Sequence, residues 1–220
     1  MRIGVIAEGH SDRAVIVNII SGLTGLDESD FQPLLPQYKY DATDKAAGRG
    51  EVHGGWNAVK DECENRIFIN DFLSQEDGDF IAIHFDTSES AQYGINQPEK
   101  NLNYSNELRN LIINKILNWL NEDLSHVLLF AIAIEEMDAW ILTLIENRNS
   151  TSTANAKKRL EYKLGYRPGK LKPNYELYLE ISNKFKTETS QNIKKYLSRN
   201  ESLNDFYEDV KSKVVPFLNN

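Results

Sequence analysis

Two continuously apolar runs constrain the fold of this chain more than any other feature. Residues 80–85 (FIAIHF) and 127–134 (VLLFAIAI) are short and contain several β-branched or aromatic side chains. Runs of this kind, without polar alternation, are typical of strands buried on both faces of a parallel sheet. Residues 2–7 (RIGVIA) form a third run of the same type. The sequence therefore predicts a parallel sheet with helices on both faces.

The segments between these runs have apolar residues at steps of three and four, which predicts helices. Ser11 is the expected N-cap of the first helix, and Gly22 and Gly25 are expected to stop it. The other predicted helices cover residues 56–73, 108–120 and 137–145. Residues 31–40 contain Pro33 and Pro36, which limits them to an edge strand or a loop. We therefore expect an α/β fold with a mainly parallel four-stranded sheet and right-handed crossovers.

Charge divides the chain into two unequal parts. The formal net charge is -8 overall, and it combines -14 in residues 1–150 with +6 in residues 151–220. A polar run, residues 149–155 (NSTSTAN), lies at this transition. We predict an α/β domain over residues 1–149 and a basic, mainly helical extension over residues 150–220 packed on it. Such an extension can simply pack against the acidic body or can contact nucleic acid.

Several classes of protein are disfavoured by what the sequence contains. Cys63 is the single cysteine, so neither an internal disulfide nor a cysteine-based zinc site is expected. No stretch approaches the roughly 20 apolar residues that span a bilayer, and the start does not have the pattern of a signal peptide. There is no nucleotide-binding Gly-x4-Gly-Lys-Ser/Thr loop and no Gly-x-Ser-x-Gly elbow. We expect a cytoplasmic protein without membrane contact and without serine- or cysteine-based hydrolysis.

Carboxylates follow three of the predicted strands. Glu8 follows the first run, Asp86 follows residues 80–85, and Glu135, Glu136 and Asp138 follow residues 127–134. Ligands collect at the carboxyl ends of parallel strands, and strands lie about 4.8 Å apart, so these side chains can converge. Oxygen ligands suit Mg²⁺ or Mn²⁺, and a cation relieves the repulsion among packed carboxylates. The alternative is that an acid before a helix only stabilises the helix N-terminus.

These residues make the chain similar to the Toprim family. In that family one strand ends in Glu-Gly and a later strand ends in Asp-x-Asp, and the three acids bind Mg²⁺. Here the first motif is VIAEGHSD (residues 5–12), with Glu8 and Gly9, and the second is IHFD (residues 83–86). His84 stands where the family has its first aspartate. The sequence EEMDAW (residues 135–140) resembles the acidic motif before a tryptophan-containing helix in the nuclease half of overcoming-lysogeny-defect enzymes.

The resemblance covers about residues 1–148 and implies metal-dependent phosphodiester hydrolysis of DNA or RNA, with a role in antiviral defence. Glu8, His84 and Asp86 would be the catalytic residues, with Glu8 and Asp86 as ligands and Glu135 or Asp138 completing a second metal site. A helix would place Glu135 and Asp138 on one face.

Phosphate contacts are expected from Arg49, in a loop with Gly48, Gly50, Gly54 and Gly55, and from the basic run Lys157, Lys158 and Arg159. A solvated charge run is the alternative for the last three. His84 has three possible roles: a Mn²⁺ ligand, a base or phosphate contact, or a structural hydrogen-bonding group. A separate ATPase would be a partner. The alternative function is a catalytically silent regulatory or assembly subunit.

Overall fold

A four-stranded parallel sheet forms the centre of the protein, as the apolar runs predict. The computed structural model describes residues 1–39 and 51–219. The sheet has the order β2-β1-β5-β6, with all neighbours parallel. Its strands are β1 (Arg2–Ile6), β2 (Phe31–Leu35), β5 (Gly78–Asp86) and β6 (Leu128–Ala133). The predicted α/β class is confirmed, and the arrangement is consistent with the Toprim-like description.

Strand β2 is an edge strand, as its prolines predict. It pairs only with β1 in the sheet, and Pro33, which has no N–H to donate, lies within it. After β2 the chain forms a small antiparallel pair of strands. This pair consists of β3 (Gln37–Lys39) and β4 (Glu51–His53).

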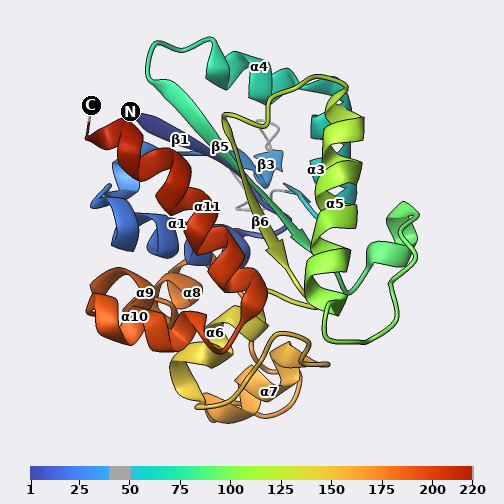
Figure 1. Ribbon diagram of the computed structural model, residues 1–220, viewed down its shortest axis with the longest axis vertical. Coiled ribbons are helices and arrows are strands. Elements are labelled where there is room, and N and C mark those ends of the chain that lie inside the picture. The colour runs from blue at the N-terminus through green and yellow to red at the C-terminus, as the bar shows by residue number, and fades with distance from the viewer. Residues whose placement is uncertain (40–50, 220) are drawn as a thin grey trace.

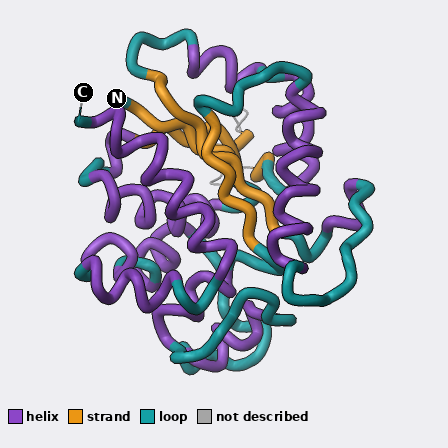
Figure 2. The backbone as a smooth tube through the Cα atoms, viewed as in Figure 1, coloured by secondary structure: helices purple, strands orange, loops and turns teal. Residues whose placement is uncertain are grey.

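Helices cover both faces of the sheet (Figures 1 and 2). One face packs against α1 (His10–Thr24) and α11 (Glu201–Leu218). The opposite face packs against α3 (Trp56–Asn65), α4 (Ile67–Leu73) and α5 (Tyr104–Leu120). Because side chains alternate along a strand, Phe80 and Ala82 lie on the α1 side and Ile81 and Ile83 on the α5 side.

The remaining elements lie around this three-layer arrangement. Two 3₁₀ turns are η1 (Glu28–Asp30) and η2 (Ser90–Tyr93). The other helices are α6 (Asp138–Ile145), α7 (Ala156–Lys163), α8 (Tyr175–Ile181), α9 (Lys184–Thr187) and α10 (Ser190–Leu197). In the part of the chain that the structure describes, no helix is both long and apolar enough to cross a membrane.

The C-terminal helices share one hydrophobic core with the sheet. Phe206 of α11 stacks on Trp140 of α6, with ring centroids 5.6 Å apart. At the β6 edge, Asp209 accepts a hydrogen bond from the backbone N–H of Phe130 at 3.0 Å, and Lys213 donates to the Leu128 carbonyl at 2.7 Å. Helix α11 therefore satisfies backbone groups of an edge strand that would otherwise need another partner. The boundary between residues 149 and 150 stays a prediction.

The boundaries of two predicted helices are wrong. Helix α1 begins at His10 with Gly9 as its N-cap, so Ser11 is not the cap, and it continues through Gly22. It ends at Thr24 because Gly25 adopts a left-handed conformation (φ 76°). Gly22 serves packing instead, since a Cβ there would lie 2.1 Å from the Phe185 carbonyl oxygen.

Residues 56–73 form two helices rather than the single predicted helix. Arg66 separates α3 from α4 and has a left-handed conformation with φ 56°. No glycine marks this position, so the local sequence carries little signal for the break. The carboxylate of Glu62 accepts a hydrogen bond from the backbone N–H of Ile69 at 2.8 Å, which links the two helices.

Candidate metal centre at the strand ends

The strand order reverses between β1 and β5. From β1 the chain moves outward to β2 on one side, and later returns to form β5 on the other side. In open parallel sheets, such a switch point leaves a crevice outside the carboxyl ends of the two strands, where ligands bind. Glu8 follows β1, and Asp86 ends β5. The backbone N–H of Asp86 donates to Glu8 Oε1 at 2.8 Å, so the two predicted ligands do lie together.

Helix α6 brings Asp138 to the same place. The Oδ1 atom of Asp86 accepts a hydrogen bond from the backbone N–H of Met137 at 2.8 Å, immediately before α6 begins. Asp138 is the first residue of that helix, where the helix dipole favours a negative charge. Its Oδ1 accepts a hydrogen bond from the Tyr178 hydroxyl of α8 at 2.6 Å. Each hydrogen bond uses one carboxylate oxygen, and the second oxygen is left to coordinate a cation.

Asp12 is a fourth member of this group, and the sequence analysis did not assign it to the site. It lies in the first turn of α1, and its pKa is raised to about 7, mainly by burial and also by the charges of Asp86 and Asp138, against the lowering effect of His84. Its place four residues after Glu8, in the first turn of the helix that follows the first strand, is the signal that could have identified it.

The carboxyl groups of this acidic cluster, defined as Glu8, Asp12, Asp86 and Asp138, all have raised pKa values. The pKa of Glu8 is raised to about 8, mainly by burial and also by the nearby charge of Asp86. Burial is also the largest cause of the raised pKa of Asp86, followed by the charge of Asp138. For Asp138, burial outweighs the Tyr178 hydrogen bond and the charge of Lys157, which both lower its pKa. The cluster therefore retains protons near neutral pH unless a cation replaces them.

His84 is a fully buried neighbour of the cluster. Its Nε2 atom lies 3.2 Å from Asp86 Oδ1, yet neither ring nitrogen makes a hydrogen bond to any residue that the structure describes. The imidazole has an exposed fraction of 0%, so it cannot itself contact a phosphate of a bound substrate. Of the roles predicted for His84, a structural hydrogen bond is not found among the described residues. A metal ligand or a group that positions Asp86 fits its location.

Glu135 and Asp138 do not share a helix face, so that prediction is wrong. Glu135 precedes α6 and has a left-handed conformation with φ 67°. Its Oε1 accepts a hydrogen bond from Lys100 at 3.1 Å, which engages its charge away from Asp138. The charge of Glu136 raises the pKa values of both Asp86 and Asp138, so this carboxylate acts on the acidic cluster.

The predicted phosphate contacts have different surroundings. Lys157 lies near the acidic cluster. Its backbone N–H donates to Glu136 Oε2 at 3.0 Å, and its charge lowers the pKa of Asp138. Lys158 is exposed, whereas the Arg159 guanidinium is bound by Glu146. Arg49 lies outside the described residues. The described end of its glycine-rich loop reaches the site, since the Gly55 N–H donates to the Glu8 carbonyl at 2.7 Å.

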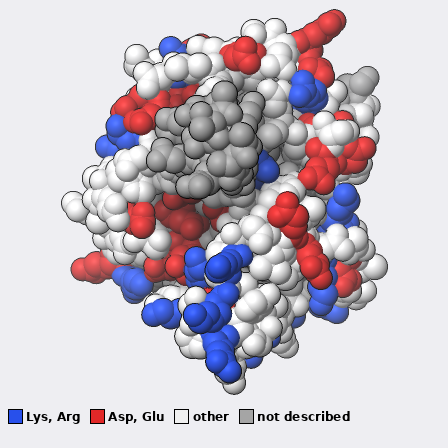
Figure 3. Space-filling model, turned by 180° about the vertical axis from the view of Figure 1, so that it is seen from behind, with Lys and Arg blue, Asp and Glu red and all other residues white. Residues whose placement is uncertain are grey.

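The acidic cluster has the oxygen donors that a cation site needs, but its side chains are not arranged around a single point. Within residues 1–39 and 51–219, no three His, Cys, Asp or Glu side chains are oriented to hold a metal ion. Figure 3 shows Asp and Glu gathered in a hollow on the back of the molecule, with a group of Lys and Arg below it. The thiol of Cys63, the single cysteine, is not activated as a nucleophile, because burial raises its pKa to about 12.

No family model matches this chain, and neither a curated protein nor a solved structure matches it. The Toprim resemblance therefore stays a hypothesis carried by the motifs around Glu8 and Asp86.

Proposed function

We propose that this protein hydrolyses phosphodiester bonds of DNA or RNA, using Mg²⁺ or Mn²⁺ bound by the acidic cluster. One observation carries the proposal. Carboxylates from β1, α1, β5 and α6 meet at the switch point of the sheet, and burial and mutual repulsion raise the pKa of each. Such crowding is costly for the protein alone and is relieved by a divalent cation.

The donor set fits such a cation. Glu8, Asp86 and Asp138 each have an oxygen beyond the one used in the hydrogen bonds described above. The imidazole of His84, whose Nε2 lies 3.2 Å from Asp86 Oδ1 without a hydrogen bond, adds a nitrogen donor. Because imidazole suits Mn²⁺ better than Mg²⁺, the set favours Mn²⁺. Glu135 is a weaker candidate than Asp12 for a further ligand, since Lys100 already engages it.

The residues around the cluster have separate tasks in this reaction. A bound divalent ion would orient the phosphodiester, activate water and stabilise the leaving oxygen. Glu8 and Asp86 would hold it, and the N–H groups of Asp86 and Met137 fix those carboxylates in place. Tyr178 keeps Asp138 oriented. Lys157, near Asp138, is placed to attract a phosphate toward the site.

A thermal-shift titration tests the metal, and a cleavage assay tests the chemistry. Saturation with Mn²⁺ to a hundred times its Kd should raise the melting temperature by about 5–10 °C. Plasmid, single-stranded DNA and RNA should then be cut by the metal-loaded protein. Glu8→Ala should abolish both effects, whereas Glu107→Ala, an exposed acid of α5, should change neither. Cleavage at the full rate in Glu8→Ala would show that the assignment is wrong.

A second candidate is a catalytically silent subunit of a multi-protein complex. The buried His84 in place of the family's first acid favours it. In that case metal can still bind, but no substrate is cut under any condition that loads the ion. By resemblance alone, an antiviral defence complex with a separate ATPase is the setting that we propose for either function. If His84 is the cause of the silence, His84→Asp should introduce cleavage, whereas cleavage by the unmodified protein would exclude the silent subunit.

A further inference from the structure

A pocket opens at the opposite end of α6 from the acidic cluster. The helix ends at Ile145, and the pocket beside it has a volume of about 570 Å³. The charged or polar residues in its wall are Glu146, Asn147, Arg148, Arg159, Tyr162 and Lys163. Because α6 has eight residues at a rise of about 1.5 Å each, this pocket lies roughly 12 Å along the helix from Asp138.

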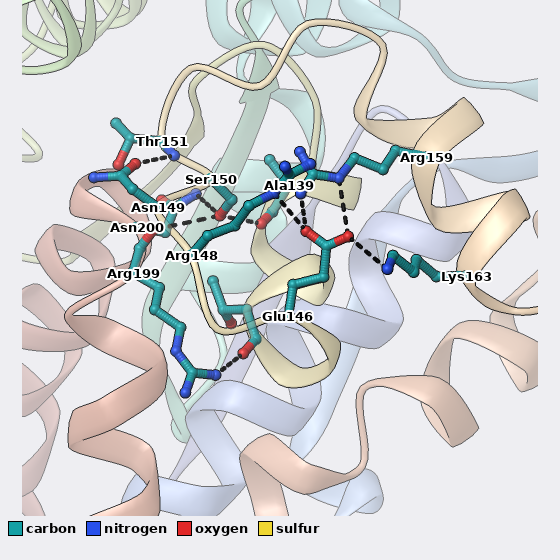
Figure 4. Close-up of polar contacts among 11 residues, drawn as sticks. Ala139, Glu146, Arg148, Asn149, Ser150, Thr151, Arg159, Lys163, Arg199 and Asn200 are labelled. Atoms are coloured by element: carbon teal, nitrogen blue, oxygen red, sulfur yellow. Dashed lines mark hydrogen bonds and ion pairs between the residues drawn. The ribbon is translucent and has the colours of Figure 1, made fainter.

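Three cations surround a single carboxylate in this wall (Figure 4). Glu146, whose side chain is 8% exposed, binds Arg159 and also pairs with Arg148 Nε at 3.0 Å and Lys163 Nζ at 3.4 Å. One negative charge holds three positive charges, which leaves a formal excess of two. The side chains of Arg148 and Lys163 remain 60% and 40% exposed, so they can bind an anion while Glu146 orients them.

A second pocket of about 440 Å³ continues this surface. It shares Asn147 and Arg148 with the first pocket and adds Lys195 and Arg199. Arg199 is held in place, because its Nη1 donates to the Thr143 carbonyl at 2.6 Å near the C-terminal end of α6. The two walls together contain five Lys or Arg and one Glu, in a chain with a net charge of -8.

An aromatic ring stands exposed in the same wall. Tyr162 of α7 is 77% exposed, whereas tyrosine side chains are on average partly buried. Cations that follow a backbone and an aromatic face on which a base stacks are the two elements of single-strand recognition. Duplex binding needs no such exposed ring, because its bases are already stacked.

We infer that this cationic groove, defined as Arg148, Arg159, Tyr162, Lys163, Lys195 and Arg199, binds single-stranded nucleic acid. Arg148 and Lys163 contact its phosphates, and a base stacks on Tyr162. The choice of nucleic acid rests on the proposed function, since one strand would then run over α7, which packs beside the buried α6, from the groove to the acidic cluster. At about 3.4 Å per phosphate in a stacked strand, roughly 12 Å corresponds to three or four nucleotides.

Fluorescence anisotropy in EDTA tests the groove without any catalysis. The probes are labelled oligo(dT) and oligo(U) of about 12 nucleotides, a duplex of the same length, and a mononucleotide. The double variant Arg148→Gln/Lys163→Gln should bind the single strands at least about tenfold more weakly and reduce the salt slope by about 1.4. Tyr162→Ala should weaken binding about fivefold or more, because it removes the stacking surface.

Matched controls separate the groove from net charge. Lys60→Gln/Lys211→Gln removes two lysines that pair with glutamates elsewhere, and Tyr166→Ala removes an exposed tyrosine outside both pockets. Neither should change affinity more than about twofold. Unchanged affinity in the groove variants, or a duplex or mononucleotide bound as tightly as the single strands, would overturn the inference. Because EDTA removes divalent metal, failure of the nuclease proposal leaves this result interpretable.

Discussion

The carboxylates at the two ends of α6 have surroundings of opposite charge. At the N-terminal end, Asp86 and Asp138 lie among other acids, and their pKa values are raised. At the C-terminal end, Glu146 is buried to the same extent as Asp138 but is surrounded by Arg148, Arg159 and Lys163. The first end is short of positive charge, and the second has an excess of it. The comparison teaches that one short helix separates a site suited to a cation from a surface suited to an anion.

The largest expected effect is on catalysis, where substitutions at the two ends of α6 should change different kinetic constants. Asp86→Asn should lower kcat for phosphodiester cleavage by at least about 10³-fold, because it removes a ligand of the ion that would stabilise the charge of the transition state. Arg148→Gln/Lys163→Gln should instead raise KM and leave kcat nearly unchanged, because its contacts are the same in ground and transition states. Steady-state kinetics with a single-stranded substrate measures both. A loss of kcat in the groove variant would break the division between the ends.

The next effect tests whether both ends depend on the packing of α6. Trp140 is fully buried, stacks on Phe206 and donates its Nε1–H to Ser202 Oγ at 2.9 Å. Trp140→Ala should lower the free energy of unfolding by about 3–5 kcal/mol. Urea denaturation measures this loss, and metal and oligonucleotide binding should weaken together in the folded variant. If only one of them weakens, the two ends do not share this support.

Neutralising a carboxylate should change the stability of the metal-free protein in different ways at the two ends of α6. Glu146→Gln leaves three cations without their shared partner and should lower the free energy of unfolding by about 1–3 kcal/mol. Asp86→Asn replaces a carboxyl group whose pKa is raised by burial and by the charge of Asp138, so the metal-free variant should lose less stability than the unmodified protein as the pH rises. Melting temperatures in EDTA over a range of pH measure both effects. An equal loss with pH in Asp86→Asn and the unmodified protein would contradict the contrast.

The acidic end also predicts how stability depends on pH. The pKa of Glu8 is about 8 and that of Asp12 about 7 in the folded protein, against ordinary values of 4.5 and 3.8. The folded state therefore binds more protons than the unfolded state between these values, and metal-free stability falls as pH rises from about 5 to about 8. Two raised pKa values of this size correspond to a loss of several kcal/mol, which urea unfolding at pH 5 and at pH 8 measures. Glu8→Gln should lose part of this dependence, and flat stability across that range would contradict the account.

Local sequence signals account for most of the sheet and part of the site. Continuous apolar runs predicted β1, β5 and β6 because these strands are buried on both faces, and the carboxylates after strands predicted that Glu8, Asp86 and Asp138 lie close together. Roles that depend on contacts between residues far apart in the sequence could not be predicted from these local signals. Tyr178 reaches Asp138 from 40 residues away, and Arg66 breaks a helix without a glycine.

The charged C-terminal segment illustrates the same limit. The basic run at Lys157 was predicted as a possible phosphate contact, but the charge pattern alone did not show that Glu146 binds Arg159. Nor did it show that Lys163 and Arg148 converge on that carboxylate from different segments. Ion pairs of this kind depend on the tertiary placement of α7 against α6, which a sequence pattern does not contain.

The central claim is that the acidic cluster exchanges its protons for a divalent cation. Isothermal titration calorimetry with Mn²⁺ near pH 7, in two buffers of different ionisation enthalpy, measures binding and proton release together. Because Glu8 and Asp12 retain protons near that pH, we predict release of about one proton or more per Mn²⁺ bound. Asp86→Asn should not bind. Absence of binding to the unmodified protein, or binding without proton release, would contradict the account.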